Sequence, residues 1–196
     1  LKDSAGKERL RLSGNNGSVR AFDSAGRTRV RISGTHGYIS AFDDSRVRVR
    51  INPVGIGRVR IWGANGDERI VIRGSAAGGS LRLKDSAGRD RVVLDAQRGS
   101  LYVKNSAGKT RVAISGSNGT VSAYDSARNP ARRIRLNGSN GSIRLSRPNG
   151  KNGIVLESGG DIRTSDETGK TRFMLDGDKG DVKTFDRAGK QRFWII

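Results

Sequence analysis

Hydrophobic and polar residues alternate with a period of two in short segments along the whole chain. In residues 28–33, for example, Val30 and Ile32 fall on one face and arginines on the other. This alternation is typical of a β-strand with one buried face. Segments of a class A lie at 8–13, 28–33, 46–51, 68–73, 90–95, 110–115, 132–137, 153–158, 171–176 and 191–196, and those of a class B at 18–23, 38–43, 58–63, 80–85, 100–105, 120–125, 142–147, 161–166 and 181–186. The pattern predicts an all-β protein of about 19 strands, and no segment predicts a helix.

Two turn motifs separate these segments. Asp-Ser-Ala-Gly-Arg at 23–27 and 85–89 fits a type I turn followed by a left-handed glycine, the three-residue hairpin loop with a G1 bulge. Asn-Gly, as in Ser-Gly-Ser-Asn-Gly at 115–119, is a strong hairpin signal. We therefore predict a single array over residues 1–196, with about ten tandem repeats of about 20 residues and two strands each. Because Leu1 lies in mid-repeat, we expect this array to be a fragment of a longer chain.

The parity of the strands places their apolar residues on one face. A sheet of this size cannot leave such a face open in water. A single-chain β-solenoid would close it internally, with each repeat forming one coil. A multi-chain β-meander fibre shaft would instead wrap several chains, most simply three, around a shared apolar axis. The antiparallel turn motifs favour the shaft. So does electrostatics, because a solenoid would stack one outward arginine per repeat about 4.8 Å apart.

The chain carries 38 basic and 19 acidic residues, a formal net charge of +19. This surplus indicates a polyanionic partner or an acidic neighbouring chain, unless arginine serves only as a solubilising surface residue. The absence of cysteine excludes a disulfide framework and cysteine-ligated zinc. No apolar run reaches the ~18 residues of a membrane span.

Residues 105–119 read Asn-Ser-Ala-Gly-Lys-Thr-Arg-Val-Ala-Ile-Ser-Gly-Ser-Asn-Gly. This tandem pattern resembles the repeats of bacterial surface proteins and phage-type tail fibre shafts. The resemblance covers nearly the whole chain, rests on turn motifs and supplies no site motif. It implies an elongated, often trimeric stalk, adhesin or receptor-binding fibre that is extracellular, on a cell surface or on a virion.

Two outward rows are candidate binding sites. The first, the arginine column, could follow a periodic polyanion such as acidic polysaccharide, lipopolysaccharide or nucleic acid, or could be a solvated or ion-paired surface. The second, the aromatic row, could stack on sugars or bases, or could contact a neighbouring chain. The arginine column is Arg9, Arg29, Arg48, Arg69, Arg91, Arg111, Arg133, Arg172 and Arg192, and the aromatic row is Phe22, Phe42, Trp62, Tyr124 and Phe185.

The last strand ends in Phe193, Trp194, Ile195 and Ile196, so both of its faces are apolar. We expect this end to mediate assembly with another chain.

Catalysis has little support in the sequence. The one histidine, His36, lies in a turn, and the aspartates recur once per repeat, as turn residues do. A glycan-active enzyme would need a carboxylate pair that the repeats do not suggest. We therefore predict no enzymatic activity, no cofactor and no metal. The sequence favours a structural or adhesive fibre or filament protein of a bacterial surface or virion, which self-associates as a trimer or polymer through β-strand contacts. The alternative is an arginine-rich polyanion-binding module.

Overall fold

The computed structural model describes residues 1–127 and 131–195, which form nineteen strands and no helix. The all-β prediction and the tandem repeat of two strands are therefore confirmed. The strands are β1 (Leu10–Ser13), β2 (Ser18–Phe22), β3 (Thr28–Ser33), β4 (Tyr38–Asp43), β5 (Arg46–Asn52), β6 (Gly57–Trp62), β7 (Glu68–Ser75), β8 (Gly78–Lys84), β9 (Asp90–Asp95), β10 (Ser100–Lys104), β11 (Thr110–Ser115), β12 (Thr120–Tyr124), β13 (Arg132–Asn137), β14 (Ser142–Ser146), β15 (Asn152–Leu156), β16 (Ile162–Ser165), β17 (Thr171–Asp176), β18 (Asp181–Phe185) and β19 (Gln191–Ile195).

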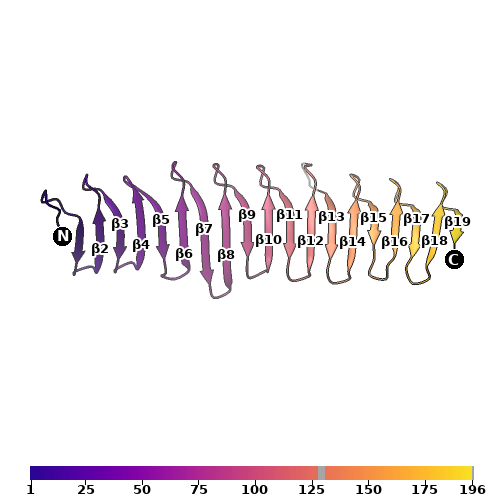
Figure 1. The fold of residues 1–196 in the computed structure, drawn as a ribbon, viewed down its shortest axis with the longest axis horizontal. Coiled ribbons are helices and arrows are strands. Elements are labelled where there is room, and N and C mark those ends of the chain that lie inside the picture. The colour runs from indigo at the N-terminus through magenta and orange to yellow at the C-terminus, as the bar shows by residue number, and fades with distance from the viewer. Residues whose placement is uncertain (128–130, 196) are drawn as a thin grey trace. The chain divides into compact units, whose positions relative to one another are not determined.

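The chain divides into two compact units, Leu1–Gln97 with β1–β9 and Arg98–Ile196 with β10–β19. In the first unit each strand pairs antiparallel with the next one along the chain (Figure 1). Val30 lies opposite Ala41, for instance, and Ile32 opposite Ile39. This arrangement is a meander. The coil of a solenoid would instead pair each class A strand in parallel with the next class A strand.

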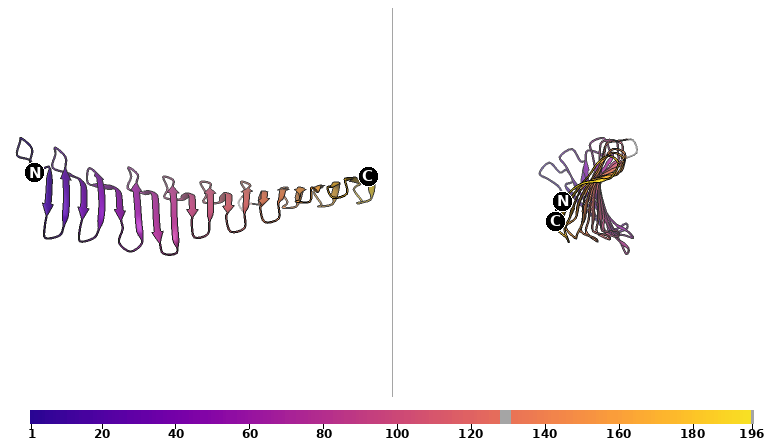
Figure 2. Two further views of the ribbon diagram at one scale, coloured as in Figure 1. Left: turned by 60° about the horizontal axis from the view of Figure 1, so that its bottom comes forward. Right: turned by 90° about the vertical axis from the view of Figure 1, so that its right-hand side faces the viewer.

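The second unit repeats this meander. Val112 lies opposite Ala123 and Ile114 opposite Val121, so the apolar residues of neighbouring strands again share one face. In each unit the strand direction turns progressively from one strand to the next (Figure 2), as the right-handed twist of L-peptide strands requires.

The turns that follow the class B strands have the predicted geometry. At Asp23 the backbone N–H donates to the Arg27 carbonyl at 2.9 Å, and the Gly26 N–H donates to the Asp23 carbonyl at 3.0 Å. Gly26 has φ 81°, the left-handed conformation that glycine adopts without a Cβ clash. The Asp23 carboxylate adds two bonds, since its Oδ1 accepts the N–H groups of Ala25 and Arg27, each at 2.9 Å. The backbone and the carboxylate of one aspartate thus together stabilise the turn.

The opposite turns pack on one another through glycine. The Gly138 N–H donates to the Gly119 carbonyl of the preceding turn at 2.9 Å. A Cβ at Gly138 would lie only 2.8 Å from that carbonyl oxygen, and one at Gly34 would lie 2.7 Å from the Gly17 oxygen. The first glycine of these turns, Gly34 or Gly138, therefore permits the close approach of neighbouring turns.

The face of the strands opposite the apolar one carries the arginines and is called here the polar face. The two buried apolar side chains lie on this polar face. Among the described residues only Val71 and Val155 are buried hydrophobics. Val71 lies between Arg60 and Arg82 in the register, and Val155 lies between Arg144 and Arg163. Long arginine stems can cover apolar surface while their charged ends stay in water. The apolar face has no such cover within its own unit.

Candidate functional site

The apolar face of each unit is exposed. Leu12 is 71% exposed and Ile134 is 43% exposed, although both belong to the face that the alternation predicts to be inward. The exposed large residues of this face are Leu12, Val30, Ile32, Ile39, Ile51, Ile72 and Leu94 in the first unit, and Val103, Ile114, Ile134, Leu136, Ile143, Leu145, Phe193 and Ile195 in the second. Contiguous apolar surface of this extent is uncommon on soluble monomers and marks a contact surface.

The arginine column coincides with a bulge in each repeat. Phe22 pairs with Thr28 and Ala21 pairs with Val30, which leaves Arg29 unpaired between them. The same register shift recurs after every class B strand from β2 to β18. The residues that the strand register skips are Arg29, Arg48, Arg69, Arg91, Arg111, Arg133, Gly153, Arg172 and Arg192. Arg9 precedes β1 at the corresponding place in the first repeat. A β-bulge changes the direction of the side chain of its extra residue. In most repeats of this chain the extra residue is an arginine, and the bulge directs it toward the preceding turn.

Most of these arginines form an ion pair with an aspartate of that turn. Arg29 Nη2 lies 2.8 Å from Asp23 Oδ2. The corresponding pairs are Arg9–Asp3, Arg48–Asp43, Arg91–Asp85, Arg133–Asp125, Arg172–Asp166 and Arg192–Asp186. Such pairing reduces the charge that these arginines can offer to a polyanion. The column as a polyanion site stays a prediction.

The turn carboxylates are held in their charged form. The backbone N–H of Arg27 lowers the pKa of Asp23 to about 2, against the partial desolvation that would raise it. The guanidinium groups of Arg27 and Arg29 act in the same direction. In a later repeat, the Thr168 hydroxyl is the main group that lowers the pKa of Asp166. Each such turn therefore keeps a negative charge beside its bulge arginine well below neutral pH.

One repeat exchanges the two partners. Arg147 stands at the head of its turn, where other repeats have aspartate, and the bulge residue is Gly153 in place of arginine. A Cβ at Gly153 would lie 3.3 Å from Arg147 Cγ, so the arginine of the turn occupies the space beside the bulge. Another repeat has Asn105 in place of the aspartate, and there Arg111 forms no ion pair with a described residue. The identity of the residue at the bulge is therefore coupled to the identity of the residue at the head of the turn.

A second arginine row crosses the middle of the polar face. These arginines are not among the candidate site residues predicted from the sequence, although the parity of the strands places them together on the face opposite the apolar one. Arg11, Arg20 and Arg31 lie opposite one another on successive strands, and Arg50 lies opposite Arg60. In the second unit Arg135 lies opposite Arg144. Directly opposed like charges are unfavourable in a sheet, so this row is an electrostatic cost that an anion would relieve.

The aromatic row lies at the ends of class B strands. Phe22, Phe42, Trp62, Tyr124 and Phe185 are all half-buried. The Arg11 guanidinium lies 5.6 Å from the Phe22 ring centre and that of Arg132 lies 5.9 Å from Tyr124. Arginines of the same chain therefore cover two of these rings. A role of this row in ligand contact stays a prediction.

The last strand has apolar side chains on both faces. Phe193, Trp194 and Ile195 of β19 are each about half exposed, at 51%, 51% and 50%. Trp194 lies opposite Lys183, whose Nζ is 5.7 Å from the ring centre, and the strand pairs with β18 along one edge. Ile196, which belongs to the same expected assembly site, lies outside the described residues.

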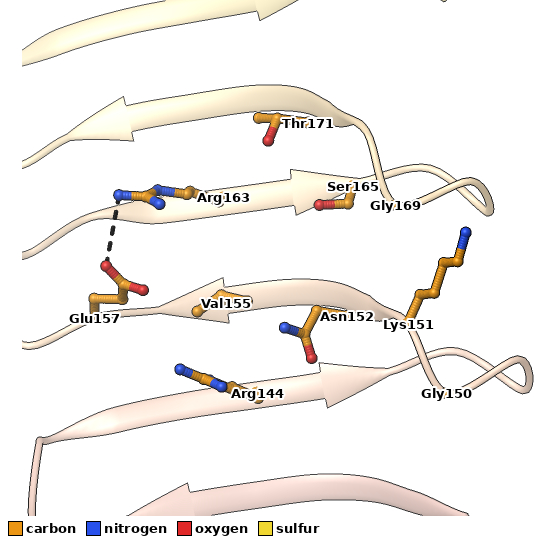
Figure 3. A pocket seen from close by; sticks show the side chains of 10 residues that line it. All are labelled: Arg144, Gly150, Lys151, Asn152, Val155, Glu157, Arg163, Ser165, Gly169 and Thr171. Carbon is orange, nitrogen blue, oxygen red and sulfur yellow. Dashed lines mark ion pairs between the residues drawn. The ribbon is translucent and has the colours of Figure 1, made fainter.

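A shallow hollow of about 450 Å³ lies on the polar face of the second unit (Figure 3). Val155 is in its floor, with Arg144 and Arg163 on the flanking strands, and Glu157 Oε2 lies 3.6 Å from Arg163 Nη2. Glu157 is the single carboxylate among the described residues that line it. The carboxylate pair used for glycoside hydrolysis is therefore not assembled in this hollow.

Other catalytic elements are also sparse in the described part of the chain. No group of three or more histidine, cysteine, aspartate or glutamate residues could hold a metal ion there. His36 Nδ1 lies 3.4 Å from the Ser33 hydroxyl in a turn, with no carboxylate among its hydrogen-bond partners. The described residues contain no helix long and apolar enough to cross a membrane. The absence of enzymatic activity stays a prediction.

No family model matches the chain, and no curated protein matches it. Among solved structures, it is similar to a structure of alternansucrase in complex with isomaltononaose. The likeness has 17% sequence identity and a TM-score of 0.25, and it covers 97% of this chain. The chain spans 15% of the length of that protein. A TM-score this low carries no conclusion about fold or function.

Proposed function

We propose that this protein is a non-enzymatic structural or adhesive element that assembles with further copies of itself. The exposed apolar face of its β-meander is the observation that carries the proposal. Burying apolar surface contributes about 25 cal/mol per Å². A face that repeats Leu, Ile and Val on nearly every strand therefore provides a driving force for association.

A second copy of the chain is the best-fitting occupant of this face. Every repeat presents the same alternation, so three or more copies can bring equivalent strands together around one apolar axis. The arginine-rich polar face then stays in water, where a net charge of +19 is tolerated. The exposed end of β19, with Phe193 and Trp194, would extend the contact to the next copy. The assembled form is a trimer or a polymer.

A fibre or filament of this kind fits a bacterial surface or a virion. The turn motifs resemble those of surface proteins and tail fibre shafts, and this resemblance supports the extracellular, cell-surface or virion location that we propose. Adhesion would then be carried out by the outward polar face.

Solution mass tests the assembly. Light scattering with small-angle X-ray scattering at moderate salt should give the mass of three or more chains. The double variant Ile134→Lys/Leu136→Lys places charges on the apolar face and should lower the mass to that of one chain. The matched variant Ser117→Lys/Ser139→Lys adds the same charge in exposed turns beside β12 and β13 and should keep the assembly. A wild-type chain that is monomeric at all concentrations would contradict the proposal.

The second arginine row supports polyanion binding as an alternative function. Its opposed pairs, such as Arg20 with Arg31, gain from a negatively charged polymer laid across the strands. Binding of an acidic polysaccharide, lipopolysaccharide or nucleic acid should then weaken steeply as salt rises. Binding that does not depend on salt would reject this alternative.

A further inference from the structure

Four arginines gather on the polar face where β5, β6 and β7 lie side by side (Figure 1). Arg50 lies opposite Arg60, and Arg58 lies opposite Arg73. Arg58 and Arg60 are two residues apart on β6, so their side chains point to the same face. None of the four belongs to the arginine column, whose members lie at the bulges.

A small cavity opens within this group. It has a volume of about 90 Å³ and is lined by Arg50, Asn52, Arg58 and Arg60. A cavity measured in this way needs about 10–15 Å³ to hold one water, so this one has room for a small anion.

The positive charge of the group is poorly compensated. Glu68 Oε1 lies 3.2 Å from Arg60 Nε as an ion pair, and Arg50 Nε donates to the Ser40 hydroxyl at 3.2 Å. The guanidinium groups of Arg58 and Arg73 have no acceptor among the described residues, and their Nε atoms are buried. One carboxylate thus faces four cations, and directly opposed like charges destabilise a sheet.

We propose that this cavity binds one tetrahedral oxyanion, a sulfate or phosphate group. The arginine fork matches the oxygens of such groups and binds them with charge-assisted hydrogen bonds. Asn52 adds an amide donor, because its Oδ1 already accepts the Val54 N–H at 3.1 Å and no described residue accepts from its Nδ2. The oxyanion is either free or an ester carried by a polymer. The site deepens the polyanion-binding alternative and does not depend on assembly, which the mass measurement tests separately.

Calorimetric titration of the assembled protein with sodium sulfate, in chloride buffer at constant ionic strength, tests the site. We expect saturable binding of about one sulfate per chain. The variant Arg58→Gln/Arg73→Gln should weaken it at least tenfold, since it removes two of the three cations of the group that have no carboxylate partner. The control Lys109→Gln/Lys179→Gln removes the same charge from two exposed turns and should bind sulfate as the wild type does. Heat without saturation, or an equal loss in both variants, would indicate charge screening alone and overturn the proposal.

Thermal unfolding measures the stability of the variant, so that a folding defect is not mistaken for a loss of sulfate binding. Without sulfate, Arg58→Gln/Arg73→Gln should unfold at a higher temperature than the wild type, because it relieves repulsion. Sulfate should raise the midpoint of the wild type more than that of the variant. A variant that is less stable than the wild type in chloride would overturn the proposal, since the arginines would then be stabilised by contacts within the protein or with another copy.

Dextran sulfate and uncharged dextran distinguish the two sources of the oxyanion. If dextran sulfate binds with the same dependence on Arg58 and Arg73 and dextran does not, the group is an ester on a polymer. If only inorganic sulfate binds, the ligand is the free anion. Either pattern supports the site, and the absence of binding by both sulfate forms rejects it.

Discussion

Arg29 lies 2.8 Å from Asp23 through their Nη2 and Oδ2 atoms, and this contact joins the bulge of one strand to the turn before it. Asp23 Oδ1 meanwhile accepts two backbone N–H groups inside the turn. One carboxylate therefore fixes both the loop and the direction of the bulge arginine. The repeat of this contact along both units explains why the turn aspartate and the bulge arginine recur together in the sequence.

Stability should depend on pH through these carboxylates. The pKa of Asp23 is about 2 in the folded chain, below its ordinary value of 3.8. A depressed pKa contributes stability that is complete above the unfolded value and is lost as the pH falls through the folded one. Asp23→Asn should therefore lower the thermal midpoint at pH 7, and its difference from the wild type should shrink below pH 4 and vanish only below pH 2.

The chain offers a reciprocal control for this pH dependence. Asn105 occupies the aspartate position of another repeat, beside Arg111. Asn105→Asp should raise the midpoint above pH 4, where the new carboxylate is charged, and should have no effect near pH 2. Thermal melts at several pH values measure both changes. Equal differences at pH 7 and pH 2 would show that the carboxylate charge is irrelevant.

The exchanged pair of Arg147 and Gly153 permits a double-mutant cycle. Arg147→Asp alone should destabilise the fold, because the turn aspartate gains no bulge arginine. Gly153→Arg alone should also destabilise it, because Arg147 already fills that space. The double variant restores the arrangement of the other repeats, so we expect a favourable coupling of about 0.5–1 kcal/mol in urea unfolding. Additive single effects would contradict the coupling of turn and bulge.

Gly138 is required by the packing of adjacent turns. Its Cβ would meet the Gly119 carbonyl oxygen at 2.8 Å, so Gly138→Ala should cost about 1–3 kcal/mol in the free energy of unfolding. Gly14 occupies the same place in the first turn, but a Cβ there would meet no atom within 4 Å. Gly14→Ala should stay within about 0.5 kcal/mol of the wild type. Urea unfolding of both variants separates this contact from the backbone preference of the turn.

Much of the fold could be predicted from the sequence because its determinants are local. The alternation of Val30 and Ile32 with arginines fixes a strand, and Asp23 with Gly26 fixes the hairpin that precedes it. Both signals lie within a few residues, so the nineteen strands and their antiparallel turns follow directly.

The remaining features depend on the pairing of strands. The bulge at Arg29 appears only when Ala21 and Phe22 are matched to their partners. The four-arginine group of β5–β7 likewise requires the register that sets Arg50 beside Arg60. The assembly proposed for the apolar face would likewise rest on contacts between chains, which the local patterns of one chain do not encode.

Val71 provides a test of the arginine cover on the polar face. Its side chain is 0% exposed and lies between Arg60 and Arg82 in the register. Val71→Ala removes two buried methyl groups, so it should lower the free energy of unfolding by about 1.5–3 kcal/mol. Val93, half-buried on the other side of Arg82, should lose less when changed to alanine. Equal losses in urea unfolding would mean that the arginine stems do not shield Val71 from water, and the polar face would then contribute charge but no packing.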